Sequence, residues 1–137
     1  MKIKIFALTH KKFEVPQDRM YQPLQVGREE KEDLGYLCDN TGDNISAENC
    51  YYSELTGLYW IWKNVHTYKY VGTCHYRRYL LNEQEKIFTE AEYLELLKDY
   101  DLITTKRVVL NNSYHYGFAT NHNIHALDMT GEVIKEL

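Results

Sequence analysis

The stretch KIKIFALTH, residues 2–10, decides the fold class. Its apolar residues run without interruption from Ile5 to Leu8 instead of alternating with polar ones. Continuous apolarity is typical of a strand that is covered on both faces, as the strands of parallel sheets are. The run ends in Thr9 and His10. We therefore expect a first strand whose carboxyl end carries polar side chains.

A second stretch, YVGTCHYRRYLL at residues 70–81, follows the same design. We expect a strand over residues 68–73, followed at once by His75, Arg77 and Arg78. Arginine keeps its charge and donates two hydrogen bonds to phosphate oxygens, and a histidine beside it can donate to a leaving phosphate oxygen. The HYRRY string therefore suits a phosphorylated ligand. An ordinary strand end with solvated arginines paired to nearby acids stays open as the alternative.

The segments between these strands are less regular. Residues 11–33 hold both prolines and are expected to form a loop with at most a short helix. Residues 34–38 predict a short strand, and the DNTGDNIS string after them predicts a turn. Residues 49–65 predict one helix with Glu54 near its start. Trp60 and Trp62 point away from each other on it, so that one is core and the other is free. The apolar face of that helix is expected to comprise Leu55, Leu58, Trp62 and Val65, with Thr56, Tyr59 and Lys63 opposite.

The rest of the chain continues the alternation of helix and strand. Residues 89–99 predict a helix in which Thr89 is the N-cap and Glu92 completes a capping box. A strand is expected over residues 101–105, irregular structure over 106–121, and a last helix from His122 to Leu137. This order favours an α/β fold, a mostly parallel sheet flanked by helices, as one domain over residues 1–137. The sequence ends inside a helix without a stop signal, so we expect a longer protein.

Composition narrows the function classes. The 137 residues carry a net charge of −4, which argues against nonspecific nucleic-acid binding. Three cysteines without a CxxC pair disfavour a disulfide framework or a structural zinc site and favour a reducing cytoplasm. No apolar run approaches the ~18 residues of a membrane span, and the N-terminus does not resemble a signal peptide. Thirteen tyrosines suit stacking on a sugar or base and equally a core with wet edges.

Other catalytic motifs are weak. GxSxG, P-loop and GxGxxG strings do not occur. Cys74 and His75 are neighbours on a strand and point to opposite faces, so they do not predict a catalytic pair. Asp99 and Asp101 match a DxD string but precede their strand. His122, His125 and Asp128 recur on one expected helix face, where they predict either a metal or phosphate site or a solvated surface.

Several stretches together resemble a bacterial family, DUF4422, of capsular or exopolysaccharide glycosyltransferases. They are KIKIFALTHKKFEVP, YQPLQVG, LGYLCDNTGDNISAEN, SELTGLYWIWKN, YVGTCHYRRYL and YDLITTKR, and they extend from residue 2 to residue 107. The resemblance implies a GT-A-like (Rossmann-like) fold, of which this chain is the N-terminal, donor-binding part. It also implies a glycosyltransferase that uses a nucleotide sugar, UDP-linked, to extend a capsular, exopolysaccharide or O-antigen chain.

The resemblance places HYRR where GT-A enzymes carry a metal-binding DxD. We therefore expect His75, Arg77 and Arg78 to be catalytic and to replace the metal, with no resident cofactor and a divalent metal not favoured. The expected donor-binding residues are Thr9, His10, Asp43, Asn44, Glu54, Tyr59, Trp60 and Lys63.

Two other functions stay open: an inactive nucleotide-binding or interaction module lacking its acceptor half, and a phosphoester-processing enzyme. The expected partners are a nucleotide sugar and a saccharide or lipid-linked saccharide, with no nucleic acid. Location is expected to be cytoplasmic with at most peripheral membrane association. The sequence does not indicate an oligomeric state.

Overall fold

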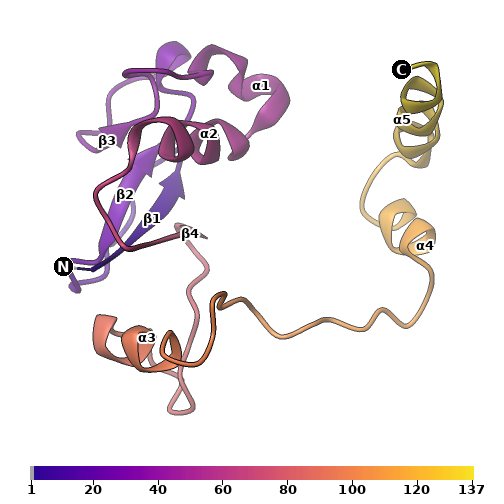
Figure 1. Ribbon diagram of the computed structural model, residues 1–137. Helices are drawn as coiled ribbons and strands as arrows, with labels where there is room; N and C mark the ends of the chain where they lie inside the picture. The colour runs from indigo at the N-terminus through magenta and orange to yellow at the C-terminus, as the bar shows by residue number, and fades with distance from the viewer. Residues whose placement is uncertain (1) are drawn as a thin grey trace. The chain divides into compact units, whose positions relative to one another are not determined.

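The computed structural model describes residues 2–137 and divides the chain into two compact units, Met1–Thr104 and Thr105–Leu137 (Figure 1). The expectation that residues 1–137 form one domain stays a prediction.

The first unit is built on a four-stranded sheet in which every pairing is parallel. The strands lie in the order β3-β2-β1-β4. Their bounds are Ile3–Thr9 for β1, Tyr21–Gln25 for β2, Leu37–Cys38 for β3 and Tyr70–His75 for β4. The predicted α/β class with a mostly parallel sheet is confirmed.

Strand β1 lies in the middle of the sheet and all seven of its residues are buried. Phe6 and Leu8 point into one hydrophobic cluster, where helix α2 (Leu55–Asn64) supplies Trp60. Ile3 and Ile5 point into a second cluster on the opposite face, around helix α3 (Glu90–Leu96). The uninterrupted apolar run is therefore explained, because both faces of β1 are covered.

The predicted loop over residues 11–33 is wrong in one part, because it contains strand β2. Pro23 weakens the strand signal, since proline donates no ladder hydrogen bond. In the sheet, β2 pairs with β1 along its whole length, but β3 pairs only with Leu24 and Gln25. Pro23 thus lies where β2 is an edge on its β3 side, and a proline is tolerated there.

The single helix predicted over residues 49–65 is two helices, α1 (Asn49–Tyr52) and α2. They are separated by Ser53 and Glu54, and the φ of Ser53, 49°, lies in the left-handed region that a residue with a side chain rarely adopts. Asn49 holds this turn, because its side-chain amide donates to the Ser53 carbonyl at 2.6 Å. The break therefore comes from a local hydrogen bond that hydrophobic periodicity does not report.

The predicted buried face of α2 is also wrong. Leu55, Leu58 and Trp62 are exposed, although Val65 beyond the helix does pack on the first cluster. The buried residues are Thr56, Gly57, Trp60 and Ile61. A Cβ on Gly57 would lie 2.7 Å from the Val26 side chain, so this glycine lets the helix lie directly on the sheet. Trp60 is buried and Trp62 is exposed, which confirms the prediction that only one of the two tryptophans belongs to the core.

Helix α3 confirms the predicted capping box. The Thr89 hydroxyl accepts from the Glu92 amide, and the Glu92 carboxylate accepts from the Thr89 amide at 2.8 Å. The strand predicted over residues 101–105 is wrong, because that segment is irregular. Ile103 still packs against the second cluster, which accounts for the apolar signal.

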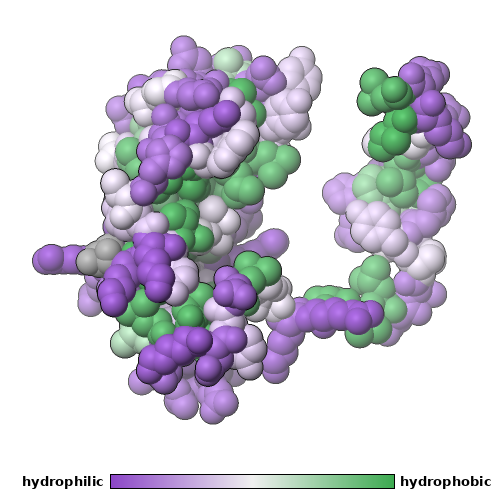
Figure 2. All heavy atoms as spheres, viewed as in Figure 1, coloured by the Kyte–Doolittle hydropathy of each residue, from purple (hydrophilic) through white to green (hydrophobic). Residues whose placement is uncertain are grey.

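The second unit contains helices α4 (Tyr114–Ala119) and α5 (Ile124–Glu136). Helix α4 falls in the region predicted to be irregular, so that prediction is wrong there. Helix α5 confirms the last predicted helix and has an apolar and a polar side (Figure 2), with Met129, Val133 and Ile134 exposed. Within residues 2–137, every helix is too short or too polar to cross a bilayer.

Candidate functional site

The carboxyl ends of the four parallel strands meet at one edge of the sheet, which we call the carboxyl edge. It carries His10 after β1, Gly27 after β2, Asp39 after β3 and Tyr76 after β4. Ligands of parallel α/β sheets bind at such an edge. The two strand ends that the sequence marks with polar residues, Thr9-His10 and HYRR, lie next to each other because β1 and β4 are adjacent strands.

Asp39 is the fully buried anchor of this edge. Its carboxylate accepts hydrogen bonds from the Gly27 amide at 2.8 Å and the Arg28 amide at 3.1 Å. It also accepts from the Ser46 hydroxyl at 2.6 Å and the Thr56 hydroxyl at 2.7 Å. One buried charge thus ties the β2 end to the 3-10 helix η2 (Ser46–Glu48) and to the first turn of α2. Four donors offset its desolvation.

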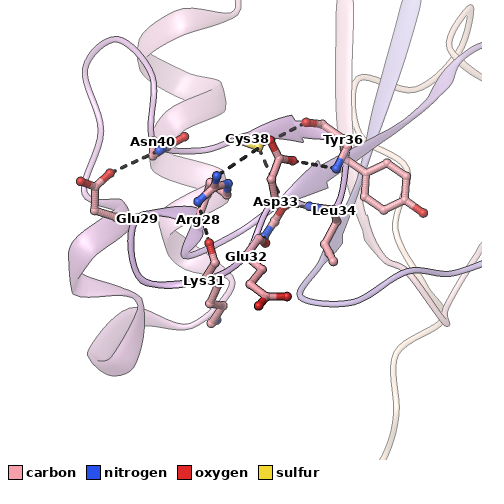
Figure 3. Close-up of polar contacts among 11 residues, drawn as sticks. Arg28, Glu29, Lys31, Glu32, Asp33, Leu34, Tyr36, Cys38 and Asn40 are labelled. Atoms are coloured by element: carbon pink, nitrogen blue, oxygen red, sulfur yellow. Dashed lines mark hydrogen bonds and ion pairs between the residues drawn. The ribbon is translucent and has the colours of Figure 1, made fainter.

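The segment between β2 and β3 is held by its own polar contacts (Figure 3). Within it, the 3-10 helix η1 spans Arg28–Glu30. The Arg28 guanidinium donates to the Lys31 carbonyl at 2.6 Å and lies 3.8 Å from the Asp33 carboxylate. The Lys31 ammonium extends to Asn49, whose side-chain oxygen it contacts at 2.9 Å. These contacts place a cation beside the carboxyl edge.

A cavity of about 250 Å³ opens at the carboxyl edge. It is lined by His10, Val26, Lys31, Asn49, Ser53 and Glu54. We call it the edge pocket. Two of these residues, His10 and Glu54, are among the predicted donor-binding residues, and the strained turn at Ser53 brings Glu54 to the pocket wall.

His75 contacts the pocket through Glu54. Its Nε2 lies 3.3 Å from a Glu54 carboxylate oxygen, and its Nδ1 accepts from the Arg77 backbone amide at 3.2 Å. This geometry fits the tautomer with the proton on Nε2. Because both ring nitrogens have protein partners, a direct hydrogen bond from His75 to a phosphate requires Glu54 to move.

Positive charge gathers around His10. The pKa of His10 is lowered below its ordinary 6.5, first by partial burial and then by Lys11, Lys31, His75 and Arg77. Arg77 and Arg78 are exposed, and across residues 2–137 neither forms an ion pair with a carboxylate. Arg78 contacts His75 through its backbone amide. These cations retain the capacity to bind an anionic ligand.

Three predicted donor-binding residues have their polar groups bonded within the fold. Thr9 is buried, and its hydroxyl donates to the Lys11 carbonyl at 2.5 Å. Asn44 bonds the Gly42 carbonyl and the Ser46 amide inside the predicted turn. Trp60 is buried in the first cluster and donates to the Thr41 carbonyl at 2.8 Å. Its ring therefore does not line the edge pocket.

The other predicted donor-binding residues form a separate cluster on α2 and the turn after β3, which we call the α2 network. The Tyr59 hydroxyl donates to Asp43 at 3.0 Å, and this bond, more than burial, raises the pKa of Tyr59. The Lys63 ammonium lies 3.9 Å from the Asp43 carboxylate and 3.9 Å from the centre of the Trp62 ring. None of these four residues lines the edge pocket.

Sequence reasoning missed Asp39, Lys31, Asn49 and Ser53. Each acts through contacts with residues at least four positions away, so no local spacing marks it. In the second unit, His122 lies before α5 and packs against Phe118, while Asp128 is 3.8 Å from His115. Of the predicted face, His125 and Asp128 lie on α5 with the expected spacing, whereas His122 lies outside that helix. Among the described residues, no group of three His, Cys, Asp or Glu side chains is placed to hold a metal.

The fold and the edge pocket define an α/β protein whose carboxyl edge presents uncompensated cations. The chain belongs to the family described as "Domain of unknown function (DUF4422)", whose model matches residues 4–137. Among solved structures it is similar to the apo form of WbbM, a bifunctional glycosyltransferase, with 42% identity and a TM-score of 0.55. That match covers 58% of this chain and 14% of WbbM. No curated protein matches the chain.

Proposed function

We propose that this chain is the donor-binding part of a GT-A-like glycosyltransferase that transfers a sugar from a UDP-linked donor to a growing surface polysaccharide. The observation that carries the proposal is the set of cations at the carboxyl edge that have no carboxylate partner among the described residues, beside a pocket lined by His10 and Lys31. Similarity to WbbM supports the reaction class. A capsular, exopolysaccharide or O-antigen acceptor comes from the family resemblance.

The chemistry requires stabilisation of a leaving group. In sugar transfer the bond from the anomeric carbon to the diphosphate breaks, and its electron pair stays on the diphosphate oxygen. Cations fixed beside that oxygen lower the barrier. Arg77, Arg78 and Lys31 are suited to this task, with His10 able to gain a proton as the anion approaches. In the proposed reaction they replace a divalent metal.

Glu54 is suited to a different part of the donor. A carboxylate repels phosphate but accepts hydrogen bonds from sugar hydroxyls. Its contact with His75 fixes it at the pocket wall, between the helix α2 and the end of β4. We therefore assign Glu54 to the sugar and the cations to the diphosphate.

The test is a calorimetric titration of UDP into the 137-residue chain, first with EDTA and then with Mn²⁺. We expect saturable binding in EDTA that weakens about 10- to 100-fold in Arg77→Ala, because a hydrogen bond to a charged group contributes about 1.5–3 kcal/mol. Lys63→Ala is the matched control, since it removes a cation that Asp43 already pairs.

Binding that needs Mn²⁺ and ignores Arg77→Ala would contradict the cation-based site. Saturable UDP binding without sugar transfer to an added saccharide acceptor would favour the inactive nucleotide-binding module instead.

A further inference from the structure

Tyr76 lies among the histidine and arginine side chains at the carboxyl edge. It is 6% exposed and follows β4 directly. Its ring centre lies 5.5 Å from that of His10 in an edge-to-face contact and 4.4 Å from that of His75. The Arg77 guanidinium carbon lies 5.1 Å from the same ring centre. One aromatic ring therefore contacts two of the groups proposed to act on the diphosphate, His10 and Arg77, and also His75, which contacts Glu54.

The ring is itself held from behind. Phe13 packs against Tyr76 at 5.6 Å and against Tyr36 at 5.8 Å. The Tyr36 hydroxyl accepts from the Phe13 amide and donates to the Phe13 carbonyl. The Tyr76 amide also donates to the Leu8 carbonyl at 3.1 Å, which fixes its backbone to β1. The ring is thus supported from β1, from the loop after β1 and from the segment before β3.

The Tyr76 hydroxyl contributes nothing visible to this arrangement. It is buried, and among residues 2–137 it has no hydrogen-bond partner. A buried hydroxyl without a partner is costly, so the residue is not explained by its polar atom. What it supplies to its neighbours is the face and edge of its ring.

An aromatic ring holds an arginine in a way that a carboxylate does not. A carboxylate would fix the guanidinium but neutralise it and compete with phosphate for its N–H groups. A ring face attracts the guanidinium through its quadrupole and leaves the charge and the N–H groups available. This explains how Arg77 can be ordered while it remains free of an ion pair.

We propose that Tyr76 is a positioning residue, whose ring orders His10 and Arg77 for a diphosphate without neutralising them and packs against His75, the partner of Glu54. The proposal rests on the proposed function, since it takes the diphosphate as the ligand. It assigns the ring, and not the hydroxyl, to this role.

The experiment uses inorganic pyrophosphate as the probe and the full 137-residue chain. Tyr76→Phe is expected to bind pyrophosphate within about twofold of the unmodified chain, because it keeps the ring. Tyr76→Leu is expected to bind about 3- to 10-fold more weakly, the range of a cation–π contact. Tyr93→Leu is the matched control, because Tyr93 is 7% exposed but belongs to the second cluster.

A second variant tests the same role of the ring if Tyr76→Leu does not fold. Pentafluorophenylalanine at position 76 preserves the shape of the ring while reversing its quadrupole, and it is expected to weaken pyrophosphate binding relative to Tyr76→Phe. A structural readout accompanies it. The His10 ring-proton signals, followed by NMR against pH without ligand, are expected to shift in Tyr76→Leu and to stay unchanged in Tyr93→Leu.

The outcomes separate the two proposals. Failure of the unmodified chain to bind pyrophosphate overturns the proposed function, whereas the NMR comparison still tests the positioning of His10. Equal pyrophosphate binding by Tyr76→Phe and its fluorinated counterpart overturns the role of the ring. A large loss in Tyr76→Phe alone overturns it as well, because the hydroxyl would then contact the ligand.

Discussion

The edge pocket and the α2 network contain similar residue types but use their charges differently. In the α2 network, Lys63 faces Asp43, and Tyr59 donates to the same carboxylate. Lys31, which lines the edge pocket, contacts a neutral amide, and Arg77, at the carboxyl edge outside the pocket lining, contacts a ring face. One cluster is satisfied internally, whereas the other holds cations whose partners are neutral.

This difference bears on how a site is recognised. A cluster of lysine, tyrosine and aspartate is consistent with a ligand site. A lysine that already pairs with an aspartate, however, attracts an added anion only weakly. Cations held by neutral groups keep their full attraction for phosphate. The α2 network is therefore better explained as a surface clamp that ties the turn after β3 to α2.

The largest expected effect tests what supports the edge pocket. Asp39→Ala removes the acceptor of four hydrogen bonds in a fully buried position. We expect a loss of about 3–5 kcal/mol in the free energy of unfolding, measured by urea denaturation. Asp43→Ala, the equivalent change in the α2 network, is expected to cost at most about 1 kcal/mol because its partners are at the surface. Similar losses in the two variants would contradict the contrast.

A smaller effect, a gain in pyrophosphate affinity, is expected from Glu54→Gln. The change removes a negative charge from the wall of the edge pocket. We expect pyrophosphate to bind about 3- to 10-fold more tightly, because repulsion of about 0.7–1.4 kcal/mol is relieved. Glu95→Gln on α3 makes the same change in net charge away from the pocket and is expected to leave the affinity unchanged. Weaker binding in Glu54→Gln would mean that its contact with His75 matters more than its charge.

The sequence predicts the strands whose signal is local. Strand β1 is a continuous apolar run, β4 ends in HYRR, and Thr89 with Glu92 marks the start of α3. Because β1 and β4 are adjacent strands, the polar residues at their carboxyl ends lie at the same edge of the sheet.

The remaining features depend on contacts between distant residues. The buried face of α2 was predicted wrongly because it contains Thr56 and Gly57, which are not strongly apolar. Thr56 is buried because its hydroxyl donates to Asp39, and Gly57 is buried because its small size lets the helix contact the sheet. Asp39 itself lies in a turn-forming string and shows no local sign of burial. Lys31 and Ser53 reach the edge pocket only because η1 and the break after α1 place them there. Propensity and spacing do not carry that information.

The titration of His10 provides a third, smaller contrast between the edge pocket and the α2 network. Because its pKa is lowered in the folded chain, the unfolded chain binds the proton more tightly. His10 therefore lowers stability as pH falls below its ordinary 6.5, until its folded pKa is passed. NMR is expected to show a midpoint below 6.5 that rises when pyrophosphate is added. Lys31→Gln is expected to raise the ligand-free midpoint slightly, while Lys63→Gln leaves it unchanged. An effect of Lys63→Gln equal to that of Lys31→Gln would contradict the separation of the two clusters.

The smallest effect is expected from Tyr59→Phe. The change removes the hydroxyl that donates to Asp43, but Asp43 keeps Lys63 as a partner and remains open to water. The loss in the free energy of unfolding is therefore expected to be the smallest of the variants compared, with pyrophosphate and UDP affinities unchanged. Calorimetry on Tyr59→Phe and Arg77→Ala side by side provides the comparison. If Tyr59→Phe weakens UDP binding but not pyrophosphate binding, the α2 network contacts the nucleoside, and the two clusters are halves of one donor site.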